Sequence, residues 1–193
     1  MSTREERAEA TRAQLLAAAR ELFAARGYAE VGTEDVVRAA GLTRGALYHH
    51  FADKRELFAA VYEQLERELV AEIGAGMAGI TDPIEMIVTG ARRYLDACQR
   101  PATRRITLLD GPTVLGWARW RQVGAEHSLG LITAALGYAM DAGAMRRQEI
   151  RPLAHLVLAA LAEAAHLVAH APDPASARAE VEPALLSLLD GLR

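Results

Sequence analysis

Apolar residues recur along most of this chain at intervals of three and four positions, which is the spacing of an amphipathic α-helix. Between residues 5 and 26 they form one stripe, made of Ala8, Leu15, Leu16, Ala19, Leu22 and Phe23. Gly27 follows as the residue expected to end this helix. No segment alternates apolar and polar residues as a half-buried strand would, so the pattern predicts an all-α fold.

Two short helices and a longer one are predicted next. Thr33 is expected to cap a helix of about two turns, and Thr43 a second one over residues 44–50. Asp53, with a glutamate three positions later, forms a capping-box start for a helix that runs to about residue 74. Two short helices joined by a glycine-centred turn and braced by longer helices are typical of a helix-turn-helix.

The remaining elements are also helical. They are predicted over residues 83–99, 102–109, 152–170 and 174–191, with one kinked or two consecutive helices within 113–141. The sequence GAGMAG at residues 74–79 formally matches a dinucleotide-binding pattern, but it follows a helix instead of a strand. It is therefore interpreted as a helix end and linker, and no cofactor is expected.

Composition excludes several classes of protein. The 193 residues are 51% hydrophobic and 24% charged, which is typical of a globular chain. The net charge is −3, and acidic and basic residues cancel within the first sixty, so DNA binding has to rest on where charges are placed. A single cysteine, Cys98, excludes an intramolecular disulfide and favours the cytoplasm. The N-terminus has no apolar signal segment, and the most apolar stretch, residues 153–171, is interrupted by His155, Glu163, His166 and His170, so no membrane partner is expected.

The start of the helix predicted over residues 44–50 has the chemistry of a base reader. In a helix-turn-helix, the second helix enters the major groove by its N-terminal end. Arg44 can donate two hydrogen bonds to guanine, and Ala46 can pack on a thymine methyl group. Gly45 costs about 1 kcal/mol inside a helix, which a close approach to DNA would offset.

The segment LTRGALYHHFADKREL, residues 42–57, resembles the recognition helix and following cap of the TetR family of transcriptional regulators. The upstream segments LFAARGY and GTEDVVRAAGL continue the match in order and spacing, so that it covers about residues 10–62; DGPTVLGWARWRQ is similar to a segment of some members. The resemblance implies a helix-turn-helix DNA-binding domain over residues 1–52, a connecting helix over about 53–74, and a larger α-helical ligand-binding and dimerisation domain over 75–193.

The resemblance also assigns roles to individual residues. It places Thr43, Arg44, Gly45 and Ala46 at base-reading positions, and Thr33, Tyr48, His49, His50 and Lys54 at phosphate-contacting positions. Tyr48 could instead be half-buried packing, and the two histidines an ordinary solvated surface. Glu34 and Asp35 depart from the expectation of a basic residue after Thr33. They suit the helix dipole, but are expected to weaken DNA binding or shift it toward lower salt.

The helix predicted over residues 152–170 is apolar on nearly every face, so one face should pack inward and another against a partner. With the last helix it predicts a homodimer built on a four-helix bundle. The expected contacts are Leu158, Ala162, Ala165, Ala169, Val181, Leu185, Leu188 and Leu192. Glu163, His166 and His170 share a helical face but lack the arrangement of a zinc peptidase, so no metal site is predicted.

A ligand pocket is expected where the scarce aromatic and polar groups gather. The candidates are Met86, Tyr94, Trp117, Trp120, His127, Tyr138 and Met140, with Asp110 and Arg121 as possible polar groups; each could equally fill the core.

These features predict a dimeric DNA-binding regulator, a repressor that a small, largely apolar ligand releases from a palindromic double-stranded operator. An activator or a ligand-independent regulator of the same fold is left open. A helical enzyme is the more distant alternative, and it is not favoured because the sequence shows no nucleophile–base set, phosphate loop or metal set.

Overall fold

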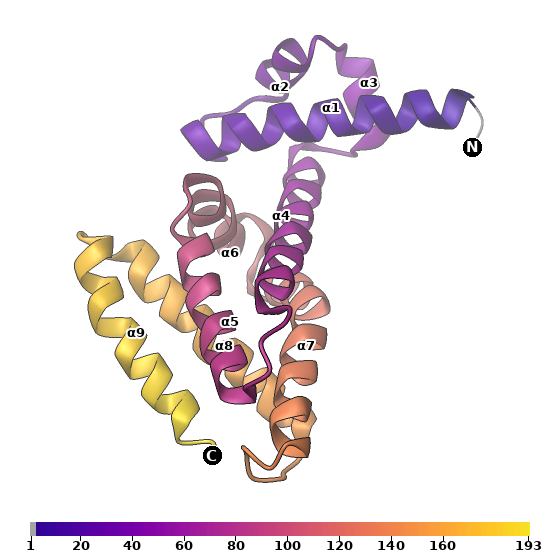
Figure 1. Cartoon of the computed structure of the whole chain (residues 1–193). Coiled ribbons are helices and arrows are strands. Elements are labelled where there is room, and N and C mark those ends of the chain that lie inside the picture. Colours follow the sequence, from indigo (N-terminus) through magenta and orange to yellow (C-terminus); the bar gives the residue numbers. More distant parts are fainter. Residues whose placement is uncertain (1–2) are drawn as a thin grey trace. The chain divides into compact units, whose positions relative to one another are not determined.

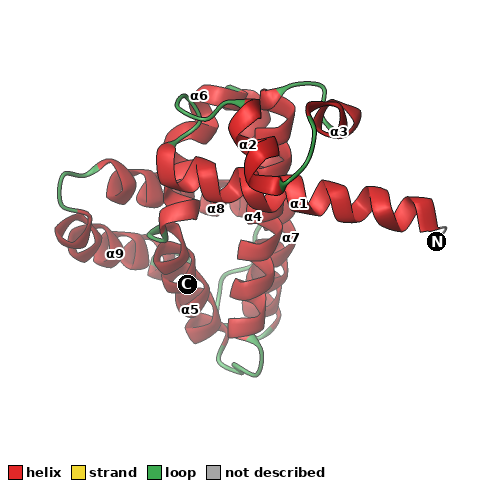
Figure 2. Cartoon of the chain, turned by 90° about the horizontal axis from the view of Figure 1, so that it is seen from above, coloured by secondary structure: helices red, strands yellow, loops and turns green. Residues whose placement is uncertain are grey.

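The computed structural model describes residues 3–193, and over that range it consists of helices and connecting loops, without a strand (Figures 1 and 2). The elements are α1 (Thr3–Arg26), α2 (Thr33–Ala40), α3 (Arg44–His50), α4 (Lys54–Met77), α5 (Pro83–Cys98), the π-helix η1 (Thr103–Asp110), α6 (Gly111–Leu115), α7 (Trp117–Asp141), α8 (Ile150–His170) and α9 (Pro174–Asp190). The all-α prediction is confirmed.

Local signals mark most of the helix ends as expected. Gly27 ends α1 with φ 79°, and Asp82 caps α5 by accepting hydrogen bonds from two backbone N–H groups at 2.8 Å. One kinked or two consecutive helices were expected within residues 113–141. The structure has two there, the end of α6 and the whole of α7, which Gly116 separates with φ 80°. One cap prediction was wrong: Gly32, not Thr33, is the N-cap of α2, because the side chain of Asp35 accepts the Gly32 N–H at 3.0 Å.

The contacts group the chain into two compact units. The first joins the described residues up to Leu65 with Pro101–Ala118, and the second joins Glu66–Arg100 with Arg119–Arg193. Residues 101–118 thus pack with the N-terminal helices although they follow α5 in the sequence.

Three aromatic rings form the centre of the first unit. Phe23 and Phe58 are fully buried, with ring centroids 5.3 Å apart, and Tyr28 lies 5.8 Å from the first and 5.2 Å from the second. Burying a side chain of this size stabilises a fold by roughly 1.5–3 kcal/mol. The cluster fixes the end of α1, the turn before α2 and the first turns of α4 in one body.

Helix α8 runs through the second unit with Ala154, Ala164 and Ala165 buried, and it packs along α9. By length and composition alone it could cross a membrane, the only such helix among the described residues. Half of its most apolar window is buried inside the protein, however, and the core helix of a soluble protein passes the same test. Packing against α5 and α9 accounts for the buried part of this apolar surface.

Candidate nucleic-acid interface

Helix α3 presents the predicted base-reading residues on its exposed side. Thr43 and Arg44 are exposed, while Leu47, on the opposite side, is fully buried. The Thr43 hydroxyl accepts the Ala46 N–H at 3.2 Å, a cap that typically contributes about 1 kcal/mol. The first turn of α3 is thus fixed by its cap and by the core, and its outer surface is left open.

A polar network spans the two helices of the helix-turn-helix. Arg44 on α3 pairs with Glu34 on α2, with Nη1 and Oε1 2.8 Å apart. Hydrogen bonds from Thr33 and Arg44 lower the pKa of Tyr48, and the Arg44 guanidinium lies 5.9 Å from the Tyr48 ring. Two predicted phosphate contacts, Thr33 and Tyr48, therefore touch each other beside the predicted base reader.

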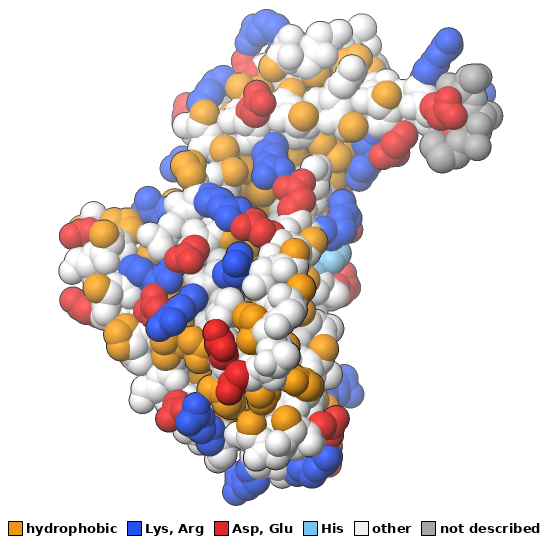
Figure 3. Space-filling view, in the orientation of Figure 1, with side chains coloured by type: hydrophobic (Ala, Val, Ile, Leu, Met, Phe, Trp, Pro, Cys, Tyr) orange, Lys and Arg blue, Asp and Glu red, His pale blue; other side chains and the backbone are white. Residues whose placement is uncertain are grey.

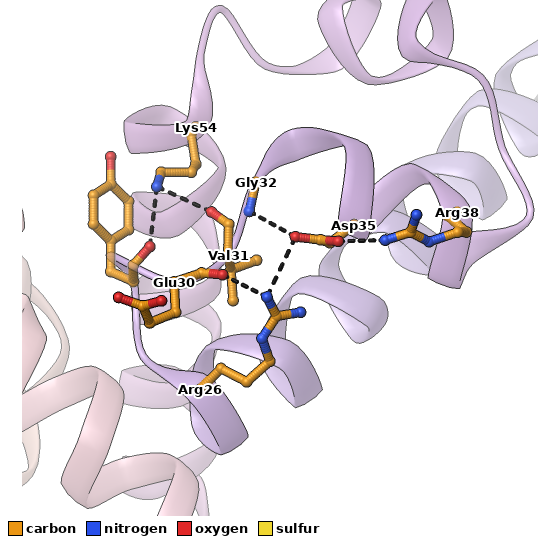
Figure 4. Close-up of polar contacts among 8 residues, drawn as sticks. Arg26, Glu30, Val31, Gly32, Asp35, Arg38 and Lys54 are labelled. Atoms are coloured by element: carbon orange, nitrogen blue, oxygen red, sulfur yellow. Dashed lines mark hydrogen bonds and ion pairs between the residues drawn. The ribbon is translucent and has the colours of Figure 1, made fainter.

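Asp35, the second acidic residue of α2, has partners other than Arg44. Asp35 forms ion pairs with Arg26 and Arg38 and accepts the Gly32 N–H (Figure 4). The Gly32 hydrogen bond lowers the pKa of Asp35, and the two arginines lower it further. The charge of Asp35 is thus compensated within the domain.

Lys54, the one lysine of the sequence, holds the turn between α1 and α2. Its Nζ donates to the carbonyl oxygens of Tyr28 and Val31, each at 3.0 Å, and lies 4.0 Å from the Tyr28 ring centroid (Figure 4). An ammonium has three N–H donors, so a phosphate contact through the third stays a prediction.

The same turn is held from a second side by η1. The Tyr28 N–H donates to Asp110 Oδ2 at 2.8 Å, and Arg105 reaches that carboxylate at 3.5 Å. Arg105 also covers Gly27, where a Cβ atom would lie 2.2 Å from the guanidinium. Asp110, considered above as a polar group of the ligand pocket, is instead part of the support of the α1–α2 turn.

The two predicted phosphate-contacting histidines lie side by side at the end of α3. The His49 and His50 rings meet edge to face at 5.2 Å, with Phe51 buried next to them.

Acidic and basic side chains alternate over the face seen in Figure 3, without one large basic patch. Within residues 3–193, no group of three His, Cys, Asp or Glu side chains could hold a metal ion.

The second unit contains an apolar cavity of about 70 Å³. Its walls come from α4 (Val70, Ile73, Met77), α5 (Ile87, Gly90, Ala91, Tyr94), α7 (Ser128, Leu131, Ile132, Ala135, Leu136), α8 (Val157, Leu158, Leu161) and α9 (Leu189). A lining that is mainly apolar, with a few polar groups, is typical of small-molecule sites. Tyr94 and Ser128 supply the hydroxyl groups of an otherwise aliphatic wall.

Tyr94 is the one predicted pocket residue that lines this cavity. Met86, like Tyr94, packs against a buried core cluster. Met140 is buried. Trp117 belongs to the first unit and is 61% exposed. The Trp120 ring meets His166, the Tyr138 hydroxyl donates to the Thr81 carbonyl at 2.8 Å, and His127 is half-buried. Arg121 does not line the cavity either.

Comparison with known proteins identifies the architecture. The model of the C-terminal domain of tetracyclin repressor-like proteins matches residues 84–192, and the model of bacterial regulatory proteins of the tetR family matches residues 15–61. The chain belongs to the TetR family of transcriptional regulators. A TetR-family regulator from Pectobacterium atrosepticum superposes with a TM-score of 0.87 at 36% identity, over 100% of this chain and 97% of that one.

Curated relatives match more locally. The regulator AcrR of Shigella flexneri is 36% identical over 104 residues, 52% of this chain and 47% of AcrR. The activator FasR of Mycolicibacterium smegmatis is 33% identical over 85 residues, 44% of this chain and 39% of FasR. This chain is therefore a TetR-family transcriptional regulator with a helix-turn-helix DNA-binding domain, like the regulators it resembles.

The predicted dimer contacts of this TetR-family protein fall into two groups. Ala165, Ala169 and Leu185 are buried inside the single chain, and the half-buried Leu158 lines the cavity, so a dimer contact at these four stays a prediction. Leu188 is 58% exposed, while Ala162, Val181 and Leu192 are half-buried. Residues not predicted as contacts, Leu156 at 68% and Leu167 at 54%, are the exposed leucines of α8. They are eleven positions apart, about three helical turns, and so share one side of that helix.

Proposed function

We propose that this TetR-family regulator is a dimeric repressor in the cytoplasm, released from a palindromic operator by a small, largely apolar ligand. The observation that carries this proposal is the double role of α4. Its first residue, Lys54, holds the turn that precedes α2, and its later residues Val70, Ile73 and Met77 line the apolar cavity. A ligand between the cavity walls would act on the same helix that supports the DNA-binding elements.

DNA recognition is assigned to the exposed side of α3. Arg44 would donate to guanine O6 and N7, with Thr43, Gly45 and Ala46 close to neighbouring bases. Thr33, Tyr48, His49 and His50 surround these positions and offer hydrogen-bond donors to phosphates. Lys54 is retained as a phosphate contact only through its third N–H.

Dimerisation is assigned to the exposed leucine side of α8 and α9. Leu156, Leu167 and Leu188 leave large apolar side chains in water, which a two-fold partner would cover. Productive half-sites would lie ~34–36 Å apart or at a multiple of that distance. A ligand would release DNA by favouring a dimer with another spacing, and the shift is limited by its differential affinity for the two states.

Activation of transcription is the second candidate, because one relative, FasR, is named an activator. Selection of bound fragments from genomic DNA, followed by a reporter assay with and without the protein, separates the two. A palindrome whose reporter rises when the protein is removed supports a repressor. A reporter that falls supports an activator, and failure to enrich any sequence contradicts both.

The ligand part is tested separately. The purified protein on its selected operator is titrated with a panel of small apolar compounds, with DNA release followed by fluorescence anisotropy. We expect release by a compound that fits the cavity, and loss of that response when Ala135→Trp fills it. A response that survives the filled cavity would place the ligand elsewhere.

A further inference from the structure

Arg44, the proposed base-reading arginine, contacts two other side chains of the helix-turn-helix. Arg44 Nη1 lies 2.8 Å from Glu34 Oε1, and the remainder of the guanidinium lies against Tyr48. Glu34 and Arg44 come from the two different helices of the helix-turn-helix, α2 and α3. Their ion pair therefore favours one orientation of the guanidinium relative to both helices.

Glu34 differs from its neighbour Asp35 in the partners and in the exposure of its carboxylate. The Asp35 carboxylate is occupied by the Gly32 N–H, Arg26 and Arg38, and its side chain is 22% exposed. The Glu34 side chain is 63% exposed beside Thr33, on the surface assigned to DNA. A carboxylate at that place repels every phosphate, so it weakens binding to any duplex unless a specific contact compensates for it.

A contact with guanine and a contact with phosphate require different positions of the Arg44 guanidinium. A guanidinium has five N–H donors, and a bidentate contact with guanine uses two of them along one edge. Nη1 can then stay on Glu34, so the pair survives in the specific complex. A phosphate that draws the whole guanidinium toward the DNA backbone breaks the pair and leaves Glu34 facing the polyanion.

We propose that Glu34 is a specificity-determining positioning residue, which holds Arg44 for guanine and penalises binding of that arginine to phosphate. The proposal rests on the proposed function, because it requires α3 to be the DNA reader. It assigns a gain in selectivity to an acidic residue that would otherwise only weaken DNA binding.

The test compares Glu34→Gln, which removes the charge and keeps the shape, with Glu30→Gln as a matched control. Glu30 is an exposed acid of the same unit, in the turn before α2, and the substitution changes the net charge equally. Affinity for the selected operator and for a scrambled duplex of equal composition is measured at several salt concentrations. Thermal melting confirms that each variant is folded.

We expect Glu34→Gln to strengthen scrambled binding more than operator binding, so that the operator-to-scrambled affinity ratio falls about two- to fivefold, the range of an exposed ion pair. Its salt slope on the scrambled duplex should steepen by about one phosphate contact. Glu30→Gln should leave the ratio unchanged. In an Arg44→Ala background, Glu34→Gln should no longer alter it.

An equal gain on both duplexes, or a ratio that falls to the same extent without Arg44, overturns the proposal, because Glu34 would then act by general repulsion alone. A wild-type protein that prefers no sequence would contradict the proposed function itself. The two failures are distinguishable, since the first leaves the operator preference of the wild type intact.

Discussion

The backbone N–H of Tyr28 donates to the carboxylate of Asp110 at 2.8 Å, joining two residues 82 positions apart in the sequence. On the other side of the same peptide segment, Lys54 donates to the Tyr28 carbonyl. The turn that leads from α1 into α2 is therefore held by η1 and by α4 together. Both contacts lie within the first compact unit.

Asp110→Ala should destabilise the first unit by about 1–3 kcal/mol, because the partly buried Tyr28 N–H loses a charged acceptor. Urea unfolding measures the change. Asp141→Ala is the matched control, since its ion pair with Arg147 is 72% and 75% exposed, and such pairs contribute little. Equal effects of the two substitutions would mean that the contact with Tyr28 does not support the turn.

Lys54→Met separates the two roles of the lysine. The substitution keeps the apolar stem but removes donors to two carbonyl oxygens, so the free energy of unfolding should fall by about 1–3 kcal/mol. DNA affinity should fall as well, because the turn before α2 loosens and because the third N–H no longer reaches a phosphate, so the salt slope should decrease by about one. An unchanged salt slope would show that Lys54 only supports the turn and would contradict the phosphate contact.

Glu66 should make stability depend on pH. Its side chain is 5% exposed, and burial raises its pKa to about 7. Since the folded state keeps this proton where the unfolded state has lost it, stability should decrease as pH rises from about 4.5 to about 7 and then level off. Glu66→Gln should remove that part of the pH dependence and stabilise the protein at pH 8, by an amount on the order of 3 kcal/mol. Denaturant unfolding at pH 5 and pH 8 measures both the pH dependence and the stabilisation. Identical stability profiles of the variant and the wild type against pH would contradict this role of Glu66.

Leu188→Glu should weaken the proposed dimer. A charge placed on the exposed leucine side of α9 would have to be desolvated in the interface, so the variant should sediment as a monomer at micromolar concentration where the wild type is a dimer. Sedimentation velocity over a concentration series measures this. A wild-type protein that is already monomeric at that concentration would contradict the dimer.

Local sequence signals predicted much of the fold, because they act between near neighbours. Thr43 caps α3, Asp82 caps α5, and Gly27 ends α1, each through contacts within about four residues. The cap of α2 was misassigned because Gly32 has no side chain to mark it, and the capping group comes from Asp35. The resemblance to a known family supplied the predicted DNA-facing positions around Arg44.

Contacts between residues far apart in the chain left no comparable signal in the sequence. Nothing near Tyr28 in the sequence indicates that Asp110 will accept its N–H. The cavity is lined mainly by aliphatic residues at helical spacing, such as Ile73 and Leu131, which look like ordinary core positions. Of the aromatic residues expected at a pocket, Tyr94 lines this cavity and the others do not. Which apolar side of α8 is buried was likewise settled only by packing, which places Ala165 inside and Leu156 outside.

The central claim is that the exposed side of α3 reads DNA sequence, and Arg44→Ala tests it most directly. Affinities of the wild type, Arg44→Ala and Tyr48→Ala are measured for the selected palindrome and for versions with single base changes. We predict that Tyr48→Ala weakens binding to all of them alike, whereas Arg44→Ala costs about 1–3 kcal/mol on the palindrome and abolishes discrimination at one guanine of each half-site. Unchanged affinity and unchanged base preference in Arg44→Ala would contradict the account.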